Sequence, residues 1–198
     1  MRGERTLFQN LSFTLGSGEL LRIGGPNGSG KTSLLRIACG LLEPEQGEVR
    51  WGGENVRRLK EEFWARLLYL GHANALKDDL TATENLEIAC TLAGLVADGR
   101  RIAAALARLG LEGRENLPAR VLSQGQRRRV ALARLALSEA APLWVLDEPF
   151  TALDAAAVEC VRGLIAGHVS RGGGVVYTTH HEASIEAVVS RRIDLAGS

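Results

Sequence analysis

A glycine-rich stretch at residues 25–32 constrains this chain more than any other part of its sequence. It reads Gly-Pro-Asn-Gly-Ser-Gly-Lys-Thr and fits the phosphate-loop pattern G-x-x-x-x-G-K-S/T. Apolar residues 20–23 lead into the stretch, and a helical pattern over residues 33–39 follows it. Because the pattern requires a strand before the loop and a helix after it, we expect a phosphate-binding loop here.

Each residue type in this loop has a physical task. Glycine reaches backbone angles that a Cβ atom forbids, so successive N–H groups can turn inward and form an anion-binding nest. The nest opens onto a helix N-terminus, where unpaired amides and the helix dipole favour phosphate. Lys31 can reach the β- and γ-phosphates, and the Thr32 hydroxyl can bind an accompanying Mg²⁺. The alternative is an ordinary glycine-rich turn. The residues expected to contact a nucleotide here are Gly25, Pro26, Asn27, Gly28, Ser29, Gly30, Lys31, Thr32 and Ser33.

The length and composition favour one domain over residues 1–198. The formal net charge is +1, which gives no electrostatic case for a nucleic acid partner. Cys39, Cys90 and Cys160 are widely spaced and form no C-x-x-C pair, so we expect reduced, buried thiols. The first residues do not lead into the apolar core of a signal peptide, and no apolar run is long enough to span a bilayer. We therefore expect a soluble protein, or one that a partner holds at a membrane.

Strand and helix patterns alternate along most of the chain. Strand patterns occur at residues 6–15, 19–24, 47–51, 67–70, 143–146 and 175–179. Helical patterns occur at residues 33–39, 81–93, 99–110, 127–134 and 151–169. This alternation predicts an α/β fold with a mostly parallel core sheet and an N-terminal antiparallel β part. A block of helices interrupts it, so we expect a helical subdomain, about residues 74–140, inserted in the nucleotide-binding core.

Capping boxes predict where helices of this block begin. Thr81 is followed three residues later by Glu84, and Ser123 is followed by Gln126. The simplest interpretation of residues 122–126 is therefore a well-capped helix.

Polar residues follow the ends of several expected strands. Gly25, His72, Asp147, Glu148 and His180 each stand just past such an end. The carboxyl ends of parallel strands meet at one edge of the sheet, where ligands bind. We therefore expect these residues to gather at one site.

Several motifs follow one another in a fixed order along the chain. They are the phosphate loop at 25–32, Leu-Ser-Gln-Gly-Gln at 122–126, Leu-Trp-Val-Leu-Asp-Glu at 143–148, Thr-Ala-Leu-Asp at 151–154 and Thr-Thr-His at 178–180. In this order and spacing they resemble an ABC-type ATPase of the P-loop NTPase class. The resemblance covers nearly the whole chain, and the motif at 122–126 is close to unique to that family.

The resemblance implies an ATP-hydrolysing enzyme whose cofactors are ATP and Mg²⁺. Lys31 and the loop amides would hold the phosphates, while Thr32 and Asp147 would hold Mg²⁺, Asp147 through a water molecule. Glu148 would polarise the attacking water, and His180 would sense the γ-phosphate. The implied catalytic residues are thus Lys31, Glu148 and His180.

The resemblance also implies a head-to-tail homodimer that closes on ATP. Ser123, Gly125 and Gln126 would act on the ATP that the phosphate loop of a second copy holds, and Asp154 would lie at the same interface. Each helix-end charge interaction is modest, about 0.3 to 1 kcal/mol, so closure would need ATP to complete both sites.

The chain departs from the family pattern at the catalytic loop and near its start. His72 stands where a glutamine usually touches Mg²⁺ or the attacking water, although it is still expected to contact the cofactor. Phe8 and Phe13 lie too late to match the aromatic residue that stacks on adenine in the family, so no adenine contact is assigned.

Further features are similar to the ATP-binding subunit of the bacterial cytochrome c maturation (haem exporter) transporter. They are Gly-His at 71–72, Gly-Glu-Val-x-Trp at 47–51, Pro-Leu-Trp at 142–144, Glu-Pro-Phe-Thr at 148–151 and the short length. This resemblance implies a CcmB-like integral membrane permease as partner, together with other cytochrome c maturation proteins. It also implies a peripheral location on the cytoplasmic face of the bacterial inner membrane.

The sequence also admits alternative functions. One is another small ABC exporter for lipid, drug or metal, and another is a soluble regulatory ABC ATPase. A module that binds ATP only as a structural ligand is disfavoured, because Glu148 and His180 occur together.

Overall fold

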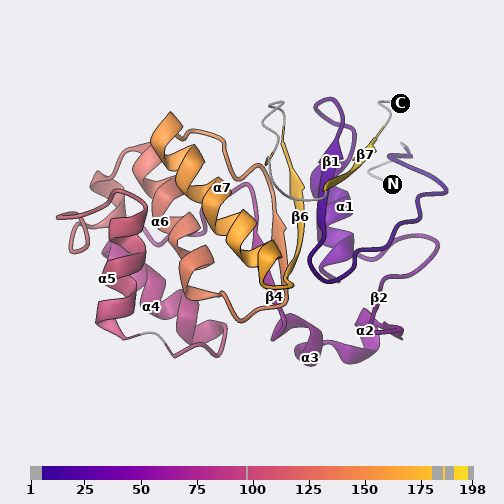
Figure 1. The fold of residues 1–198 in the computed structure, drawn as a ribbon, viewed down its shortest axis with the longest axis horizontal. Helices are drawn as coiled ribbons and strands as arrows, with labels where there is room; N and C mark the ends of the chain where they lie inside the picture. The colour runs from indigo at the N-terminus through magenta and orange to yellow at the C-terminus, as the bar shows by residue number, and fades with distance from the viewer. Residues whose placement is uncertain (1–5, 97, 180–184, 186–189, 196–198) are drawn as a thin grey trace. The chain divides into compact units, whose positions relative to one another are not determined.

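The computed structural model describes residues 6–96, 98–179, 185 and 190–195 (Figure 1). The chain packs as two compact units. Unit 1 comprises Met1–His72, Ala141–Glu148 and His168–Ser198. Unit 2 comprises Ala73–Ala140 and Pro149–Gly167.

A parallel five-stranded sheet with the strand order β4-β5-β6-β1-β7 forms the centre of unit 1. Its strands are β1 (Leu20–Gly24), β4 (Leu67–Leu70), β5 (Leu143–Leu146), β6 (Gly174–Thr178) and β7 (Ser190–Asp194). Every residue of β5 and β6 is buried, as expected for inner strands of a parallel sheet that is covered on both faces. The predicted α/β class and parallel core sheet are therefore confirmed.

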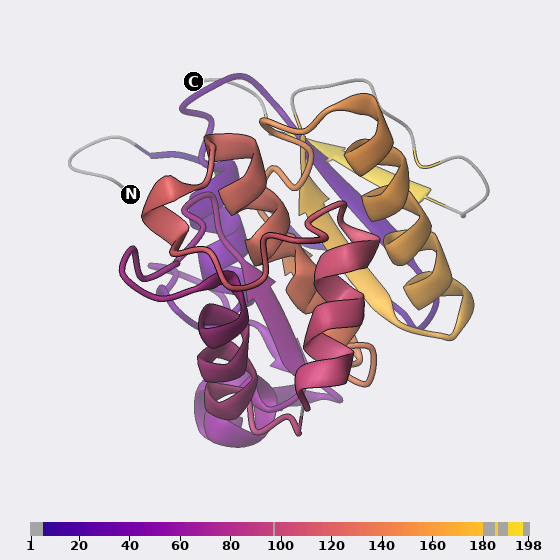
Figure 2. The ribbon, with the colours of Figure 1, turned by 90° about the vertical axis from the view of Figure 1, so that its left-hand side faces the viewer.

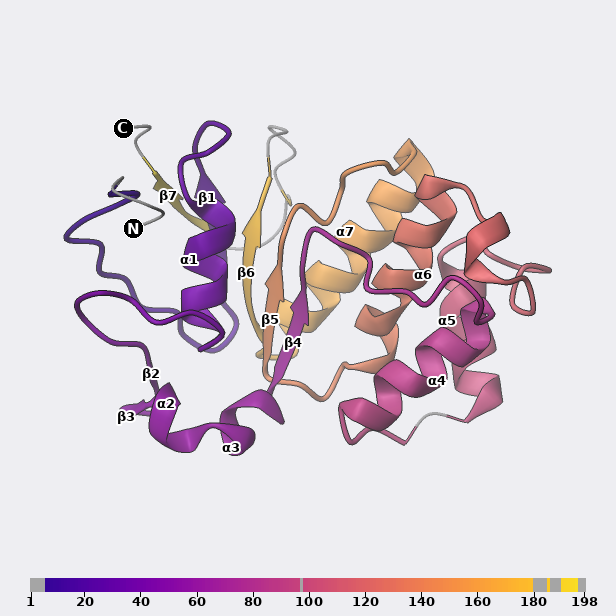
Figure 3. The same cartoon turned by 180° about the vertical axis from the view of Figure 1, so that it is seen from behind.

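Helix α1 (Lys31–Ala38) packs on this sheet directly after the phosphate loop (Figure 3). Its Leu34 and Leu35 join a buried apolar cluster with side chains from β1, β5 and β6. Cys39, at the end of the helix, belongs to the same cluster, and burial raises the pKa of its thiol to about 12. All three cysteines are free; Cys39 and Cys90 are buried as predicted, whereas Cys160 is only half-buried.

The antiparallel part of the fold is a short hairpin in unit 1. It joins β2 (Arg50–Trp51) and β3 (Glu54–Asn55) and leads into α2 (Val56–Leu59) and α3 (Glu61–Trp64). Asn55 caps α2 by accepting a hydrogen bond from the backbone N–H of Arg57 at 2.9 Å. The prediction of an antiparallel β part is confirmed at this hairpin.

The prediction of a strand over residues 6–15 is wrong. All of these residues are described, and none belongs to a strand. Phe8, Leu11, Phe13 and Leu15 nevertheless pack against the core of unit 1, while the polar residues between them are mostly exposed. Alternation predicts which side chains face a core, but a strand also needs a neighbour whose backbone groups complete the ladder.

Unit 2 contains the helical block. Its helices α4 (Ala82–Leu92), α5 (Gly99–Arg108) and α6 (Gln124–Leu137) contact one another (Figure 2), and a short 3₁₀ turn, η1 (Ala119–Val121), precedes α6. Most of α7 (Ala155–Ser170) also belongs to this unit. The buried Ile102 and Leu106 on α5 follow the predicted helical spacing.

Both predicted capping boxes are present in unit 2. The Thr81 hydroxyl accepts from the backbone N–H of Glu84 at 3.1 Å, and the Glu84 carboxylate accepts from the backbone N–H of Thr81 at 2.7 Å. Ser123 and Gln126 make the same reciprocal pair at the start of α6. Among the described residues, no helix combines the length and the apolar character that crossing a bilayer requires.

Candidate functional site

The phosphate loop links β1 to α1 in unit 1, and its backbone requires glycine. Gly25, Gly28 and Gly30 have positive φ angles of 135°, 80° and 96°. A Cβ atom on Gly25 would lie 2.7 Å from both the Leu195 carbonyl oxygen and Ser29 Oγ. An L side chain at Gly25 would therefore be strained by its φ and by its neighbours.

The chain supplies the donors for an anion at this loop. The N-cap residue of α1 is Gly30, which has no side chain with which to cap the first backbone amides of the helix, and such amides suit an anionic ligand. Ser29 is buried, and its hydroxyl oxygen has no hydrogen-bond partner within the part of the chain that the structure describes. Lys31 is 6% exposed, and its Nζ donates to the carbonyl oxygens of Gly25 at 2.8 Å and Pro26 at 3.0 Å. These features fit a phosphate ligand.

A chain of hydrogen bonds connects the loop to the end of β5. Thr32 Oγ1 donates to Asp147 Oδ2 at 2.8 Å, and Thr178 Oγ1 donates to Asp147 Oδ1 at 2.7 Å. The Thr178 hydroxyl in turn accepts from the backbone N–H of Glu148 at 2.9 Å. Asp147 is 1% exposed and Thr178 is fully buried, so this network holds the Asp147 carboxylate in a fixed orientation.

Glu148 has a conformation that is rare for its residue type. Its φ is 50°, in the left-handed region that costs a side-chain-bearing residue of order 1 kcal/mol or more. Its Oε2 atom lies 4.0 Å from Nδ1 of His72, which follows β4. The His72 side chain is 69% exposed, while that of Glu148 is 17% exposed. The fold thus brings together the two polar residues expected beside the attacking water.

The oxygen donors at this edge fit Mg²⁺. Within the described residues, no group of three or more His, Cys, Asp or Glu side chains could enclose a metal ion. Mg²⁺ in nucleotide enzymes typically uses one or two protein ligands, and substrate phosphates and water complete its shell. The Thr32 hydroxyl and the Asp147 carboxylate form such a small oxygen set beside the loop.

The remaining loop residues are exposed or partly buried, and Phe8 lies beside them. Pro26, Asn27 and Gly28 are exposed, and Ser33 is partly buried in the first turn of α1. Phe8 lies against the loop, because a Cβ atom on Gly30 would come within 3.2 Å of the Phe8 ring. Sequence spacing alone assigns Phe8 no contact with adenine.

Unit 2 holds the second group of predicted residues. A Cβ atom on Gly125 would lie 2.9 Å from the Ala152 carbonyl oxygen, so glycine permits close contact with the loop that carries Asp154. Asp154 accepts hydrogen bonds from Arg129 Nη2 and from the backbone N–H of Ala157. The bond from Ala157 and the nearby Arg129 guanidinium lower the pKa of the Asp154 carboxyl. Within unit 2, the start of α6 with Ser123, Gly125 and Gln126 is therefore in contact with the loop that carries Asp154.

The structure adds residues that sequence reasoning missed, and one predicted residue lies outside it. Thr178 links Asp147 to Glu148; the motif at 178–180 contains this residue, but sequence reasoning alone assigns it no role. Burial, together with the neighbouring Asp147 carboxylate, raises the pKa of the Tyr69 hydroxyl on β4. His180 lies outside the described residues, so its expected role as γ-phosphate sensor stays a prediction.

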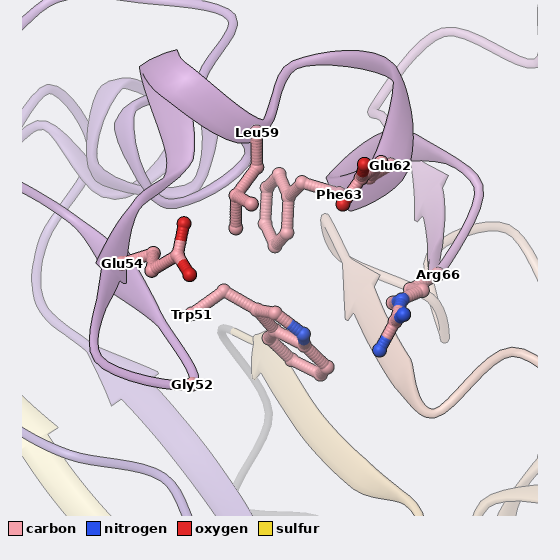
Figure 4. A pocket seen from close by; sticks show the side chains of 7 residues that line it. All are labelled: Trp51, Gly52, Glu54, Leu59, Glu62, Phe63 and Arg66. Atoms are coloured by element: carbon pink, nitrogen blue, oxygen red, sulfur yellow. The ribbon is translucent and has the colours of Figure 1, made fainter.

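A cavity of about 210 Å³ lies elsewhere in unit 1 (Figure 4). It lies between the β2–β3 hairpin and helices α2 and α3. Its lining residues are Trp51, Gly52, Glu54, Leu59, Glu62, Phe63 and Arg66. None of them belongs to the phosphate loop or to the Asp147 network, so this cavity is not part of the candidate site.

Comparisons with known proteins agree with this geometry. A family model described as ABC transporter matches residues 8–151. The chain is 54% identical over 196 residues to the cytochrome c biogenesis ATP-binding export protein CcmA of Nitrosomonas europaea, covering 99% of this chain and 92% of that protein. It is 52% identical over 195 residues to the CcmA protein of Nitrosospira multiformis, covering 98% and 94%. A solved dimeric ATP-binding cassette, in a post-hydrolysis state with bound ADP and Pi, is 29% identical with a TM-score of 0.83, covering 100% and 92%.

Proposed function

The chain belongs to the ABC transporter family as an ATP-binding, ATP-hydrolysing subunit, and on this basis we propose that it serves the haem exporter of cytochrome c biogenesis. The proposal rests first on the Thr32–Asp147–Thr178–Glu148 network, which supplies an ATPase site at the phosphate loop. It rests second on the export proteins for cytochrome c biogenesis to which the chain is about half identical.

Different residues of unit 1 bind the phosphates and the Mg²⁺ ion during ATP hydrolysis. The loop amides and Lys31 bind the phosphates and orient the γ-phosphate for in-line attack. Thr32 and Asp147 would hold Mg²⁺, which when bound neutralises charge on the β- and γ-phosphate oxygens. Thr178 keeps the Asp147 carboxylate in place for that task.

Glu148 acts as the general base in this proposal. As the oxygen of a water molecule bonds to the γ-phosphorus, Glu148 accepts a proton from that water. The bond between the γ-phosphorus and the β–γ bridging oxygen breaks, which yields ADP and phosphate. His72 lies close enough to Glu148 to help orient the water, and His180 would contact the γ-phosphate.

The active form in this proposal is a head-to-tail homodimer. Ser123, Gly125 and Gln126 lie at the start of α6, where a helix N-terminus suits a phosphate ligand. In the dimer they complete the ATP site at Lys31 of the second copy, with Asp154 at the same interface. The similar solved cassette is itself a dimer that holds ADP and Pi.

We further propose one functional domain over residues 1–198, with the helices of about residues 74–140 as its subdomain. Its partner is a CcmB-like integral membrane permease working with other cytochrome c maturation proteins, at the cytoplasmic face of the bacterial inner membrane. The names of the relatives, which are export proteins, support a membrane partner. The balanced charge of +1 gives no reason to expect nucleic acid as a partner.

Genetic complementation tests this function. Deleting the gene should abolish haem-stained c-type cytochromes in membranes, and the wild-type chain should restore them. The Glu148→Gln variant should be present in the cells at the same protein level as the wild type but should not restore the c-type cytochromes. Normal c-type cytochromes in the deletion strain would contradict the haem exporter role, while the ATPase assignment would stand.

A further inference from the structure

The loop that follows His72 is fixed within unit 2 by a buried amide. We call residues 73–80, between His72 and the helix cap Thr81, the linking loop. Asn85 on α4 is only 7% exposed, and its Oδ1 accepts from the backbone N–H of Lys77 at 2.8 Å. Its Nδ2 donates to the carbonyl oxygens of Lys77 and Leu80 at 3.1 Å. The linking loop is therefore not a free connection, since one side chain satisfies its backbone groups at several points.

Arg127 ties the linking loop to the start of α6. It stands one residue after Gln126, and its backbone N–H donates to the Ser123 carbonyl oxygen at 2.9 Å. Its Nη2 donates to Asp78 Oδ1 at 2.5 Å, and its Nη1 donates to the Ala119 carbonyl oxygen at 3.1 Å. The guanidinium thus joins the linking loop to η1, and the backbone of the same residue joins the Ser123 turn, which we define as residues 123–126. Charge-assisted bonds in a fixed fork geometry hold such a junction better than a single ion pair.

Arg128 makes a second link from the same helix turn. It is 4% exposed, and its Nη1 donates to Asn74 Oδ1 at 3.3 Å. Asn74 stands two residues after His72 in the chain. The linking loop is therefore held to α6 near both of its ends, at Asn74 and at Asp78.

We propose that Arg127 is a positioning residue that makes the linking loop and the Ser123 turn move as one piece. This inference rests on the proposed function, in which the Ser123 turn of one copy binds ATP held by the other copy. When that turn engages ATP, Arg127 transmits the displacement to the linking loop, which begins directly after His72. ATP at one site of the dimer thereby positions His72 at the other site, and the two sites become cooperative.

A kinetic comparison of matched variants tests this link in the full-length chain. Arg127→Met keeps an apolar side chain but removes the guanidinium, and Asp78→Asn removes the carboxylate charge from the other partner of the same pair. Arg120→Met is the control, because Arg120 pairs with Asp79 on the same loop without involving α6. ATP turnover is measured against ATP concentration, and binding of a fluorescent ATP analogue to the single subunit is measured in parallel.

The wild type should hydrolyse ATP with a Hill coefficient above 1, up to a limit of about 2 for a dimer. Arg127→Met and Asp78→Asn should bring the coefficient to about 1 and lower kcat about 3- to 10-fold, a coupling of ordinary size for contacting residues. Analogue binding and thermal unfolding should stay close to the wild type, and Arg120→Met should remain cooperative.

These outcomes separate the link from the function on which it rests. A wild type without ATP turnover would overturn both. A cooperative wild type whose Arg127→Met and Asp78→Asn variants remain equally cooperative would overturn the link alone, as would a non-cooperative wild type that turns over ATP. Equal loss of cooperativity in Arg120→Met would also overturn the link. Breaking any side-chain bond of the linking loop would then abolish cooperativity, and the bond between Arg127 and Asp78 would have no special role.

Discussion

Thr32 Oγ1 lies 2.8 Å from Asp147 Oδ2, although 115 residues separate the two in the chain. Thr32 stands in the first turn of α1 and Asp147 follows β5, so the parallel sheet brings them to one edge. The same edge holds Thr178 at the end of β6, whose hydroxyl bonds both Asp147 and the backbone of Glu148. Hydrogen bonds therefore connect the expected metal ligands to the expected general base.

Replacing Thr178 by Val should slow hydrolysis without abolishing ATP binding. The variant keeps the shape of the side chain but leaves the Asp147 carboxylate and the Glu148 N–H without their shared partner. We expect kcat to fall about 10- to 100-fold and the free energy of unfolding to fall by about 1 to 3 kcal/mol, the cost of unpaired buried groups. Steady-state kinetics and urea unfolding measure the two effects. Thr178→Ser, which keeps the hydroxyl, should retain most activity, and equal loss in both variants would contradict the role of the hydroxyl.

Glu148→Gln should separate ATP binding from ATP hydrolysis. The amide has nearly the same shape as the carboxylate but cannot accept a proton from water, so kcat should fall about 10²- to 10⁴-fold. Binding of a fluorescent ATP analogue should be unchanged. Turnover at the wild-type rate would remove Glu148 from the role of general base.

His72→Gln should keep or raise activity. The His72 ring lies 4.0 Å from the Glu148 carboxylate and is largely exposed, which suits a residue that only orients water. A glutamine amide supplies the same kind of polar contact, so we expect kcat within about 3-fold of the wild type, while His72→Ala should lose about 10-fold. Complete loss of activity in His72→Gln would show that the imidazole has a task of its own.

His168 should make the protein less stable in acid. It is 2% exposed and stacks on Trp144 with ring centroids 3.8 Å apart, and burial lowers its pKa from 6.5 to about 4. The unfolded chain therefore binds the proton more readily, so His168 contributes stability that is fully present above pH 6.5 and is lost as the pH falls toward 4. The loss between pH 7 and pH 4.5 is about 2 to 3 kcal/mol.

The matched variant for this prediction is His168→Phe, which keeps an aromatic ring against Trp144. Urea unfolding of both proteins at pH 7 and pH 4.5 isolates the contribution of His168 from that of the carboxyl groups. The difference between the two proteins should change with pH by the predicted amount. A difference that does not depend on pH would show that His168 titrates normally.

Local patterns predicted much of the fold from the sequence. β4 occupies the predicted residues 67–70, because a short apolar run between turns admits few other structures. Both capping boxes are present, because each depends only on residues three positions apart. The strand at Ser190–Asp194 was not predicted, since its sequence Ser-Arg-Arg-Ile-Asp has no apolar run. It lies at the edge of the sheet, where pairing with β1 alone defines it.

The candidate site shows the same division between local and long-range information. The phosphate loop, Asp147 and Glu148 belong to motifs, so the sequence identified them. The contact of Phe8 with Gly30 and the bonds of Thr178 depend on how distant strands pack, and no local pattern contains that information. The sequence placed Arg127 in the helical pattern at residues 127–134, and only the structure shows its bond to Asp78.

The central claim is that Lys31 of one copy and Ser123 of another form one ATP site. Lys31→Ala should bind ATP weakly, because charge-assisted contacts of about 1.5 to 3 kcal/mol each are lost. Ser123→Arg should bind ATP but block the partner's site, so each variant alone should be inactive. A mixed dimer nevertheless contains one intact pair of Lys31 and Ser123.

The decisive measurement is therefore the ATPase rate of Lys31→Ala and Ser123→Arg proteins mixed in equal amounts. Random exchange of subunits should restore ATPase activity up to about a quarter of the wild-type rate, the value for uncoupled sites, because half of the dimers are mixed and each mixed dimer has one intact site. Mixing Lys31→Ala with the double variant Lys31→Ala/Ser123→Arg should restore nothing, because no intact pair can form. If the first mixture is no more active than its components, Lys31 and Ser123 do not meet between copies, and the account is contradicted.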